Sequence, residues 1–246
     1  MIYKQIKPHP ILADYIDAYW TVSGDGKKLL SEKILPDGCV DIILNLGDDV
    51  KTDNGTCNIK NEKAYLVGTM KNFKIVEMKP ETKLLGIRFK PAAFSAFYKF
   101  TSLHQITDIT VEFEKKLSPD LKQVILNSSE YLNQFFINKL TQPRHFLLPV
   151  VADIKNCKGQ ISVSELATLH FTTTKQLERN FKTYVGVSPK EFINLVRFQS
   201  VLPVIQNKSS KRSLLEIALE HGYYDHSHLA NEIKRYTGLA PTGNVV

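Results

Sequence analysis

The sequence predicts an α+β protein: a β-barrel-like amino-terminal domain with trailing helices, then an all-α domain in which a central helix joins two helix-turn-helix units. Two observations predict this order. Short β-prone runs separated by turn residues fill the first part of the chain, with no helical crossover between them. Beyond residue 142, apolar residues recur at helical spacing together with helix-capping sequences. We therefore assign residues 1–142 to the first domain and residues 143–246 to the second.

Six β-prone runs predict the strands of the first domain. They are Ala18–Val22, Lys28–Leu35, Cys39–Leu46, Ala64–Met70, Phe73–Lys79 and Leu84–Lys90. Turn sequences such as Pro36-Asp37-Gly38 lie between them. Parallel neighbours would need long, usually helical, crossovers, which this spacing does not provide. We therefore expect a β-barrel or a sandwich.

The first domain ends in helical segments. Apolar spacing predicts helices over Ala92–Phe100, Asp120–Leu126 and Ser129–Leu140, and a helix over Phe146–Lys155 leads into the second domain. Four apolar residues share one face of the third helix: Leu132, Phe135, Phe136 and Leu140. This stripe packs either on its own domain, which we favour, or on a second subunit, so a homodimer remains open.

The central helix is predicted over residues 188–206. Ser188 suits the N-cap, Pro189 the first helical position, and Glu191 the third position of a capping box. Few positions behind this start are polar, so we expect the helix to be buried on more than one side. Pro203 removes the hydrogen bond to the carbonyl of Gln199, and we expect it to kink or end the helix.

The same motif occurs on both sides of the central helix, over residues 161–183 and 213–236. Capping boxes are predicted for Ser162 with Glu165, Thr173 with Gln176, and Ser213 with Glu216, while Asp225 caps the last helix. Ala167 and Ala218 lie 51 residues apart, and Leu177 and Leu229 lie 52 apart. The small residue allows two helices to cross closely. Two helix-turn-helix patterns with matching caps indicate an internal duplication, a more specific signal than a single pattern.

The last third of the chain carries a longer set of matching residues. They are Leu166-Ala167, Leu177, Arg179, Phe181-Lys182, Gly186, Ser188-Pro189, Arg197, Ile217-Ala218, Gly222-Tyr223, Asp225, Ser227 to Leu229, Lys234, Gly238 and Pro241. With this set the chain resembles the AraC/XylS family of bacterial transcription regulators. Asn231 and Ile233 depart from the family, which usually has Arg and Phe there, and Asn231 puts DNA contacts by the second unit in question.

The first part resembles the amino-terminal domains attached to one branch of the same regulators. The matching pieces are Tyr19-Trp20, Leu35 to Gly38, Gly86 to Pro91, and Phe94. The resemblance implies a barrel-like sensor for an unidentified small-molecule effector, with double-stranded DNA and RNA polymerase as partners of the chain. Five residues are candidates to line an effector pocket, although aromatic residues in strands are more often simple core. They are Tyr19, Trp20, Tyr65, Phe73 and Arg88.

The second helix of each unit is expected to enter a major groove of DNA. The candidate DNA-binding residues of the first unit are Thr172, Thr173, Thr174, Lys175, Gln176, Arg179 and Lys182. Gln176 suits adenine and Arg179 suits guanine, because each offers a bidentate pairing. Those of the second unit are His226, Ser227, His228, Asn231, Lys234 and Arg235. We expect one of the two histidines to touch DNA and the other to pack.

Charge and cysteine usage narrow the function without locating the site. The net charge of +7 suits an anionic partner. From residue 159 onward, however, the chain has ten Lys and Arg and seven Asp and Glu, so the positive charge is not concentrated in the predicted DNA-binding part. Cys39, Cys57 and Cys157 lack metal-ligand spacing, so we expect reduced, structural cysteines, no metal and no cofactor. No apolar run reaches bilayer length, and we expect a cytoplasmic protein without membrane contact.

Three other classes remain open. The first is an enzyme or metal-binding barrel with an accessory DNA-binding module, for which Asp37, Asp41, Glu77 and Arg88 are the charged candidates near strand ends. No nucleophile motif or phosphate loop supports it. The second is a regulator-like DNA-repair methyltransferase, which would need a reactive cysteine in a positive pocket. The third is a first domain that binds another protein while the second binds DNA weakly.

Overall fold

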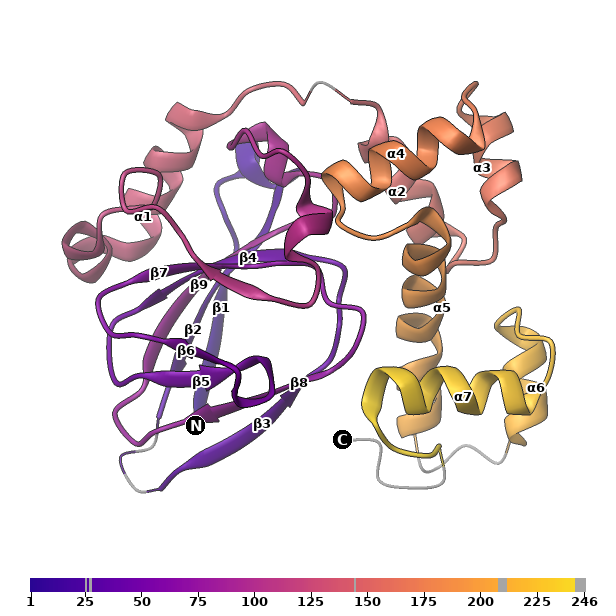
Figure 1. Ribbon diagram of the computed structural model, residues 1–246, viewed down its shortest axis with the longest axis horizontal. Coiled ribbons are helices and arrows are strands. Elements are labelled where there is room, and N and C mark those ends of the chain that lie inside the picture. Colours follow the sequence, from indigo (N-terminus) through magenta and orange to yellow (C-terminus); the bar gives the residue numbers. More distant parts are fainter. Residues whose placement is uncertain (25, 27, 144, 208–211, 242–246) are drawn as a thin grey trace.

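The computed structural model describes residues 1–24, 26, 28–143, 145–207 and 212–241. Its first part contains ten strands in two antiparallel sheets (Figure 1). The six-stranded sheet has the order β1-β2-β9-β4-β7-β10, with bounds Ile2–Ile6, Ile16–Ser23, Lys83–Phe89, Val40–Asn45, Ala64–Val67 and Thr110–Glu112. The four-stranded sheet has the order β3-β8-β5-β6, with bounds Leu30–Ile34, Lys74–Met78, Val50–Thr52 and Cys57–Ile59. Within the described chain these strands form two sheets and not one closed barrel.

The two sheets pack face to face. One apolar cluster draws Trp20, Ile43 and Leu84 from the six-stranded sheet, and Val50 and Met78 from the four-stranded sheet. Each of the six predicted runs overlaps one observed strand. Four strands were missed, because β5, β6 and β10 have only three residues each and β1 is an exposed edge strand without alternating burial.

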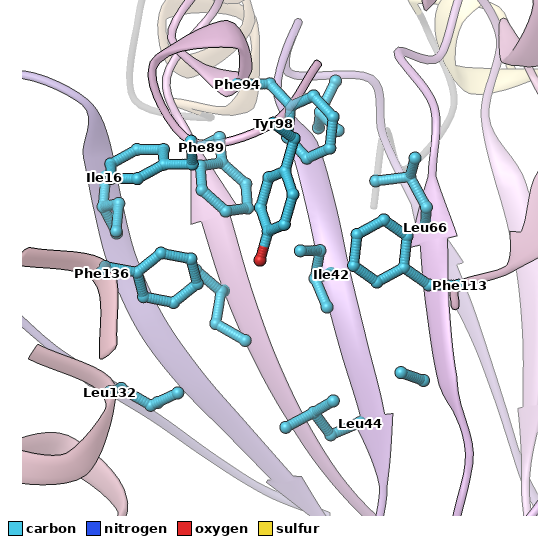
Figure 2. Close-up of a cluster of buried hydrophobic side chains, with 14 of the residues drawn as sticks. Ile16, Ile42, Leu44, Leu66, Phe89, Phe94, Tyr98, Phe113, Leu132 and Phe136 are labelled. Atoms are coloured by element: carbon cyan, nitrogen blue, oxygen red, sulfur yellow. The ribbon is translucent and has the colours of Figure 1, made fainter. Parts of the chain in front are cut away.

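Helical segments cover the other face of the six-stranded sheet. They are the 3-10 helices Pro10–Leu12, Phe94–Ala96 and Leu103–Ile106 and the α-helix α1 (Leu121–Lys139), whereas the 3-10 turn Asp53–Gly55 joins β5 to β6 and contacts the four-stranded sheet. Figure 2 shows the resulting core, in which Phe89 of the sheet meets Phe94 and Tyr98 edge-on and Phe136 of α1 in the same way. This layer fixes α1 on the sheet.

One of the helix predictions for the first part needs correction, and the others can be compared with α1. The expected helix over residues 92–100 is a single 3-10 turn, because Ala92 has a left-handed φ of 69° that breaks the helical path directly after Pro91. The two helices expected over 120–126 and 129–140 are confirmed, because the helical path of α1 is broken between them at Asn127, which has a non-helical φ of −152° and ψ of 70°. The intramolecular interpretation of the apolar stripe is confirmed, because Leu132 and Phe136 are 0% exposed in the core of their own chain.

The second part of the chain is helical. Its elements are α2 (Leu147–Asn156), α3 (Val163–Leu169), α4 (Thr174–Tyr184), α5 (Pro189–Gln206), α6 (Leu214–Glu220) and α7 (His226–Thr237). Both predicted helix-turn-helix pairs are present, as α3 with α4 and α6 with α7. No described helix is long and apolar enough to cross a membrane.

Helix α5 is buried on several sides, as predicted. Phe192 and Val196 pack with α2, α3 and α4, while Val201 packs with α6 and α7. Phe198 packs against Tyr236 of α7 and Leu35 of the β-rich part. The helix continues to Gln206, so the exposed Pro203 lies in its last turn, and the Asn207 N–H donates to the Pro203 carbonyl. The one helix thus joins both helix-turn-helix units.

The caps explain where the helices begin. Complete capping boxes form at Ser162, Ser188 and Ser213, as predicted. The box expected at Thr173 is only half formed: its hydroxyl accepts from the Gln176 backbone N–H, while the Gln176 side chain bonds other residues of α4. The N-caps therefore fix the start of each helix, and the Gln176 side chain bonds other residues of α4 instead of completing the cap.

The packing of α5 predicts a large effect of truncating Phe198, which is 0% exposed and lies 4.6 Å from the Tyr236 ring between centroids. Phe198→Ala should lower the free energy of unfolding by about 3–5 kcal/mol through lost burial and a cavity. Urea denaturation of the full chain measures this. Lys190→Ala, at an exposed position of the same helix, should stay within about 0.5 kcal/mol of the unmodified chain. A loss below about 1 kcal/mol for Phe198→Ala would contradict the role given to α5.

Candidate nucleic-acid interface

Helix α4 has one buried and one exposed face. Leu177 and Phe181 are buried against α5 and its neighbours. Lys175, Arg179 and Lys182 are exposed, and their spacing of four and three residues puts them on one face. The structure therefore has Leu177 and Phe181 on the inner face and Lys175 and Arg179 on the outer face, as the sequence predicted. Thr172 is half-buried in the turn, while Thr173 and Thr174 are exposed.

The polar side chains of α4 are ordered by hydrogen bonds to one another. The Arg179 guanidinium donates to Gln176 Oε1 at 2.6 Å, and Gln176 Nε2 donates to Asn180 Oδ1 at 3.0 Å. Asn180 is buried, so the chain of bonds is anchored in the core. Gln176 and Arg179, the pair expected to read bases, are thus brought together on the surface and pre-oriented. The spacing of the sequence predicted their common face but not this bonding.

Helix α7 repeats the arrangement. Leu229, Ile233 and Tyr236 are buried. The exposed residues include every candidate of the second unit: His226, Ser227, His228, Asn231, Lys234 and Arg235. Both histidines are exposed, and the His228 ring packs edge-on against Tyr223 at 5.3 Å between centroids, which agrees with the expectation that one of the two packs.

Sequence reasoning missed two histidines that tie each unit to the helix before it. His170 and His221 are the C-caps of α3 and α6 and lie 51 residues apart, the same offset as the duplicated alanines. His170 Nε2 lies 3.0 Å from Asp153 Oδ2 of α2, and His221 Nδ1 lies 3.2 Å from Ser200 Oγ of α5. Burial lowers the pKa of His221, so it is neutral near pH 7. The matching offset was the signal that could have found them.

Arg197 of α5 binds the backbone just before the first helix-turn-helix unit. Its guanidinium donates to the Gly159 carbonyl at 3.1 and 2.9 Å, and its cationic group lies 5.5 Å from the centre of the Tyr223 ring. Gly159 has a φ of 71° and its missing side chain would meet the α5 backbone, so the chain approaches α5 closely here. Arg197 therefore connects the start of the first unit to the second. Burial raises the pKa of Glu232, which lies beside Tyr223.

The β-rich part contacts the carboxy-terminal end of α4. Thr107 Oγ1 donates to the Gly186 carbonyl at 2.6 Å, with His104 Nδ1 2.8 Å from the same oxygen. Ser102 Oγ donates to the Lys182 carbonyl at 3.1 Å. Ser102 thereby satisfies a carbonyl that the end of α4 leaves unpaired, while Thr107 and His104 bind the loop directly after the helix.

The end of α7 is held in the same way. Lys33 of β3 donates to the Thr237 carbonyl at 2.7 Å, a contact also favoured by the helix dipole. Lys33 also lies over the Phe73 ring, against which Gly238 packs. Figure 1 shows α4 and α7 both running from the outer side of the molecule toward the sheets. Their first turns therefore remain free of the β-rich part.

A pocket of about 190 Å³ lies between the two sheets. Of the five residues proposed to line an effector pocket, Trp20 and Arg88 do so. Tyr19 points to the opposite face of β2, into the core under α1, because neighbouring residues of a strand alternate. Tyr65 packs between the sheets outside the pocket lining, and Phe73 lies at the contact with α7.

The polar end of this pocket is a linked set of side chains. Trp20 Nε1 donates to Asp41 Oδ1 at 2.6 Å. Arg88 Nε lies 3.5 Å from the same Asp41 oxygen and 3.3 Å from Asp37 Oδ2. Burial raises the pKa of Asp41 to about 6, against the opposing effect of Arg88. Trp20 lies directly over Gly86, where any Cβ would fall 1.9 Å from the indole.

The residues weighed for enzymatic or metal sites have other partners. Asp37, Asp41 and Arg88 pair with one another, and Glu77 lies 3.9 Å from Lys51 on the surface. Among the described residues no group of three His, Cys, Asp or Glu could hold a metal ion. Burial raises the pKa of Cys39 well above its usual value, which disfavours the thiolate that a methyltransferase needs.

Comparisons with known proteins match the two parts of the chain separately. Residues 166–243 match the family described as "Helix-turn-helix domain", and residues 4–112 match "Domain of unknown function (DUF6597)". A Haemophilus influenzae protein described as an uncharacterized HTH-type transcriptional regulator is 30% identical over 101 residues, 41% of this chain and 33% of that protein. The HTH-type transcriptional regulator MtrA of Neisseria gonorrhoeae is 36% identical over 66 residues, 27% of this chain and 21% of MtrA. The aligned part thus spans a third or less of these relatives.

Solved structures of ToxT from Vibrio cholerae share the fold. One has a TM-score of 0.50 at 12% identity and covers 100% of this chain and 98% of ToxT. An apo variant of ToxT has a TM-score of 0.50 at 14% identity and covers 92% of this chain and 96% of that protein. At these identities the likeness concerns the fold, which combines a sheet-rich first part with a helical second part.

The contact between Trp20 and Gly86 predicts a fluorescence signature, because Trp20 is the one tryptophan of the sequence. Gly86→Ala should displace the indole, shift its emission to longer wavelength and destabilise the chain by about 1–3 kcal/mol. Gly55→Ala, where a Cβ would meet no atom within 4 Å, should leave the emission unchanged even though its φ of 89° strains the backbone. An unaltered emission spectrum for Gly86→Ala would show that the indole does not lie on Gly86.

Proposed function

We propose that this chain, an AraC-type protein with two helix-turn-helix units, is a sequence-specific DNA-binding transcriptional regulator. One observation carries the proposal. Two helix pairs with the same caps are held at the two ends of one buried helix, and each presents an exposed polar face on its second helix. The relatives described as HTH-type transcriptional regulators support the same function. Paired elements of this kind suit successive major grooves on one side of a duplex.

The roles within the interface follow from side-chain chemistry. In the first unit, Arg179 addresses guanine and Gln176 addresses adenine, while Lys175 and Lys182 contact phosphates. The second unit, with Asn231 at the centre of its exposed face, contributes less charge and reads fewer bases. Successive grooves lie about 34 Å apart, and the 18 residues of α5 span about 27 Å, so we expect the DNA to bend toward the protein.

The remaining assignments are part of the same proposal. Residues 1–142 act as a regulatory domain for a small-molecule effector or partner, and residues 143–246 as the DNA-binding domain. RNA polymerase is the expected second partner of a chain that activates transcription, and the chain would act in the cytoplasm, with no catalytic role of its own. Ile125 and Leu126 of α1 are exposed apolar residues, and we propose them as the contact of a homodimer.

Selection of bound fragments from random genomic DNA by the full chain tests the function. We expect the best fragments to bind at least about 1,000-fold more tightly than random DNA at physiological salt. A common short sequence should recur among them. Equal affinity for all fragments, or no binding at low salt, would contradict a sequence-specific regulator.

Replacing Arg179 tests the reading of bases by α4. Arg179→Ala should weaken binding to the selected sequence by about 1–3 kcal/mol and relax the preference at one base pair. Competition gel shifts on selected and random DNA measure both effects. Lys122→Ala, at an exposed position of α1, should change neither, because the helix α1 lies apart from α4 (Figure 1). An equal loss on selected and random DNA would assign Arg179 to phosphate.

A further inference from the structure

The pocket between the sheets has an excess of acidic groups. Three carboxylates line it: Glu32, Asp37 and Asp41. Three positive groups also line it, at Lys74, Arg88 and the amino terminus of Met1, but Lys74 is neutralised by Asp53 at 2.6 Å, a carboxylate outside the pocket lining that also accepts from Thr110. Arg88 pairs with two of the three carboxylates, Asp37 and Asp41. With Lys74 neutralised by Asp53, three carboxylates stand against two positive groups, so the lining carries one more negative than positive charge.

The rest of the pocket suits an apolar body of small size. The indole of Trp20 forms part of the pocket wall. It packs on Gly86, its N–H donates to Asp41, and the Tyr3 ring lies 6.4 Å away between centroids. Aromatic faces attract organic cations, the more so where water is excluded. A volume of about 190 Å³ admits a short chain or a single ring, and not a long aliphatic tail.

We propose that this pocket binds a small organic cation, an amine or guanidine with a short apolar body, whose charged group contacts Asp37 and Asp41. The carboxylates converge beside Arg88 without a full complement of positive partners, and the raised pKa of Asp41 is consistent with that shortage. A bound cation supplies the missing charge, and its apolar part packs on Trp20. An anionic ligand would meet three carboxylates against the Arg88 guanidinium and the amino terminus of Met1.

The same loop that carries Asp37 also touches the central helix. Pro36 accepts from Gln199 Nε2 of α5 at 3.1 Å through its carbonyl. Gly38 has a φ of 77° and comes so close that a Cβ would lie 2.8 Å from the Phe192 ring of α5. A cation that moves Asp37 relative to Arg88 therefore moves residues packed on α5. Ligand binding is thereby coupled to the helix that holds both reading units, a step that rests on the proposed function.

Matched sets of small molecules test the ligand class. The full chain is titrated with phenethylamine, agmatine and benzylamine, and with neutral and anionic analogues of the same size, such as 2-phenylethanol and 3-phenylpropanoate. Trp20 fluorescence and thermal shift report binding. We expect amines to bind at least 10-fold more tightly than their analogues. Equal or tighter binding of the neutral or anionic members overturns the proposal. So does the absence of a response by either method to any amine at about 10 mM, a concentration that detects even weak ligands.

Matched amide variants locate the site. Asp41→Asn keeps an oxygen that can accept from Trp20 but removes the charge, and should weaken amine binding at least 10-fold. Asp37→Asn should act in the same direction. Glu77→Gln, on β8 outside the pocket lining, is the control and should bind as the unmodified chain does. Circular dichroism confirms that each variant folds. Unchanged amine affinity in both aspartate variants places the amine elsewhere and overturns the assignment.

A separate measurement tests the coupling. On the selected DNA, a bound amine should change the affinity of the full chain at least threefold. Gln199→Ala removes the bond to Pro36 and should lose most of this effect while its amine affinity stays within twofold. An unchanged effect of the amine in Gln199→Ala excludes this loop as the route. If the chain binds no DNA with or without amine, the proposed function fails, while the fluorescence titration still decides the ligand class.

Discussion

The burial of helix α5 is the constraint on which the rest of the structure depends. A single rod supplies apolar side chains to the first helix-turn-helix unit through Phe192 and Val196, and to the second through Val201. Between them, Phe198 packs with Tyr236 of α7 and Leu35 of the β-rich part. Because packed cores have few alternative arrangements, the orientation of the two helix-turn-helix units is set by how their apolar side chains pack against α5. Any change in α5 is felt by both units together.

The β-rich part adds a second constraint at the far ends of α4 and α7. Side chains from it satisfy carbonyls in the last turns of both helices, through Ser102 at α4 and Lys33 at α7, and Thr107 binds the loop after α4. The contacts leave the first turns exposed, where the polar candidates lie. The spacing of the two reading helices is therefore determined by both halves of the chain, and the inter-sheet pocket lies next to the loop that contacts α5.

The sequence predicted the helical part well because its signals are local. Capping residues and apolar spacing placed α3 to α7 to within a few residues, and the exposed face of α4 followed from the burial of Leu177 and Phe181. Short strands such as β5 have too few residues to show alternation. The bonds of Gln176 and the contacts of the Pro36 and Gly186 carbonyls depend on groups brought close only by folding. Of the pocket candidates, Tyr19 failed because one strand sends adjacent residues to opposite faces.

Hydroxyl-radical footprinting of the full chain on its selected DNA sequence tests most directly whether α5 presents both units to one duplex. The account predicts two clusters of protected positions on one face of the DNA, about 10 base pairs apart between centres, as two neighbouring major grooves require. One cluster alone, or two clusters on opposite faces of the duplex, would contradict it.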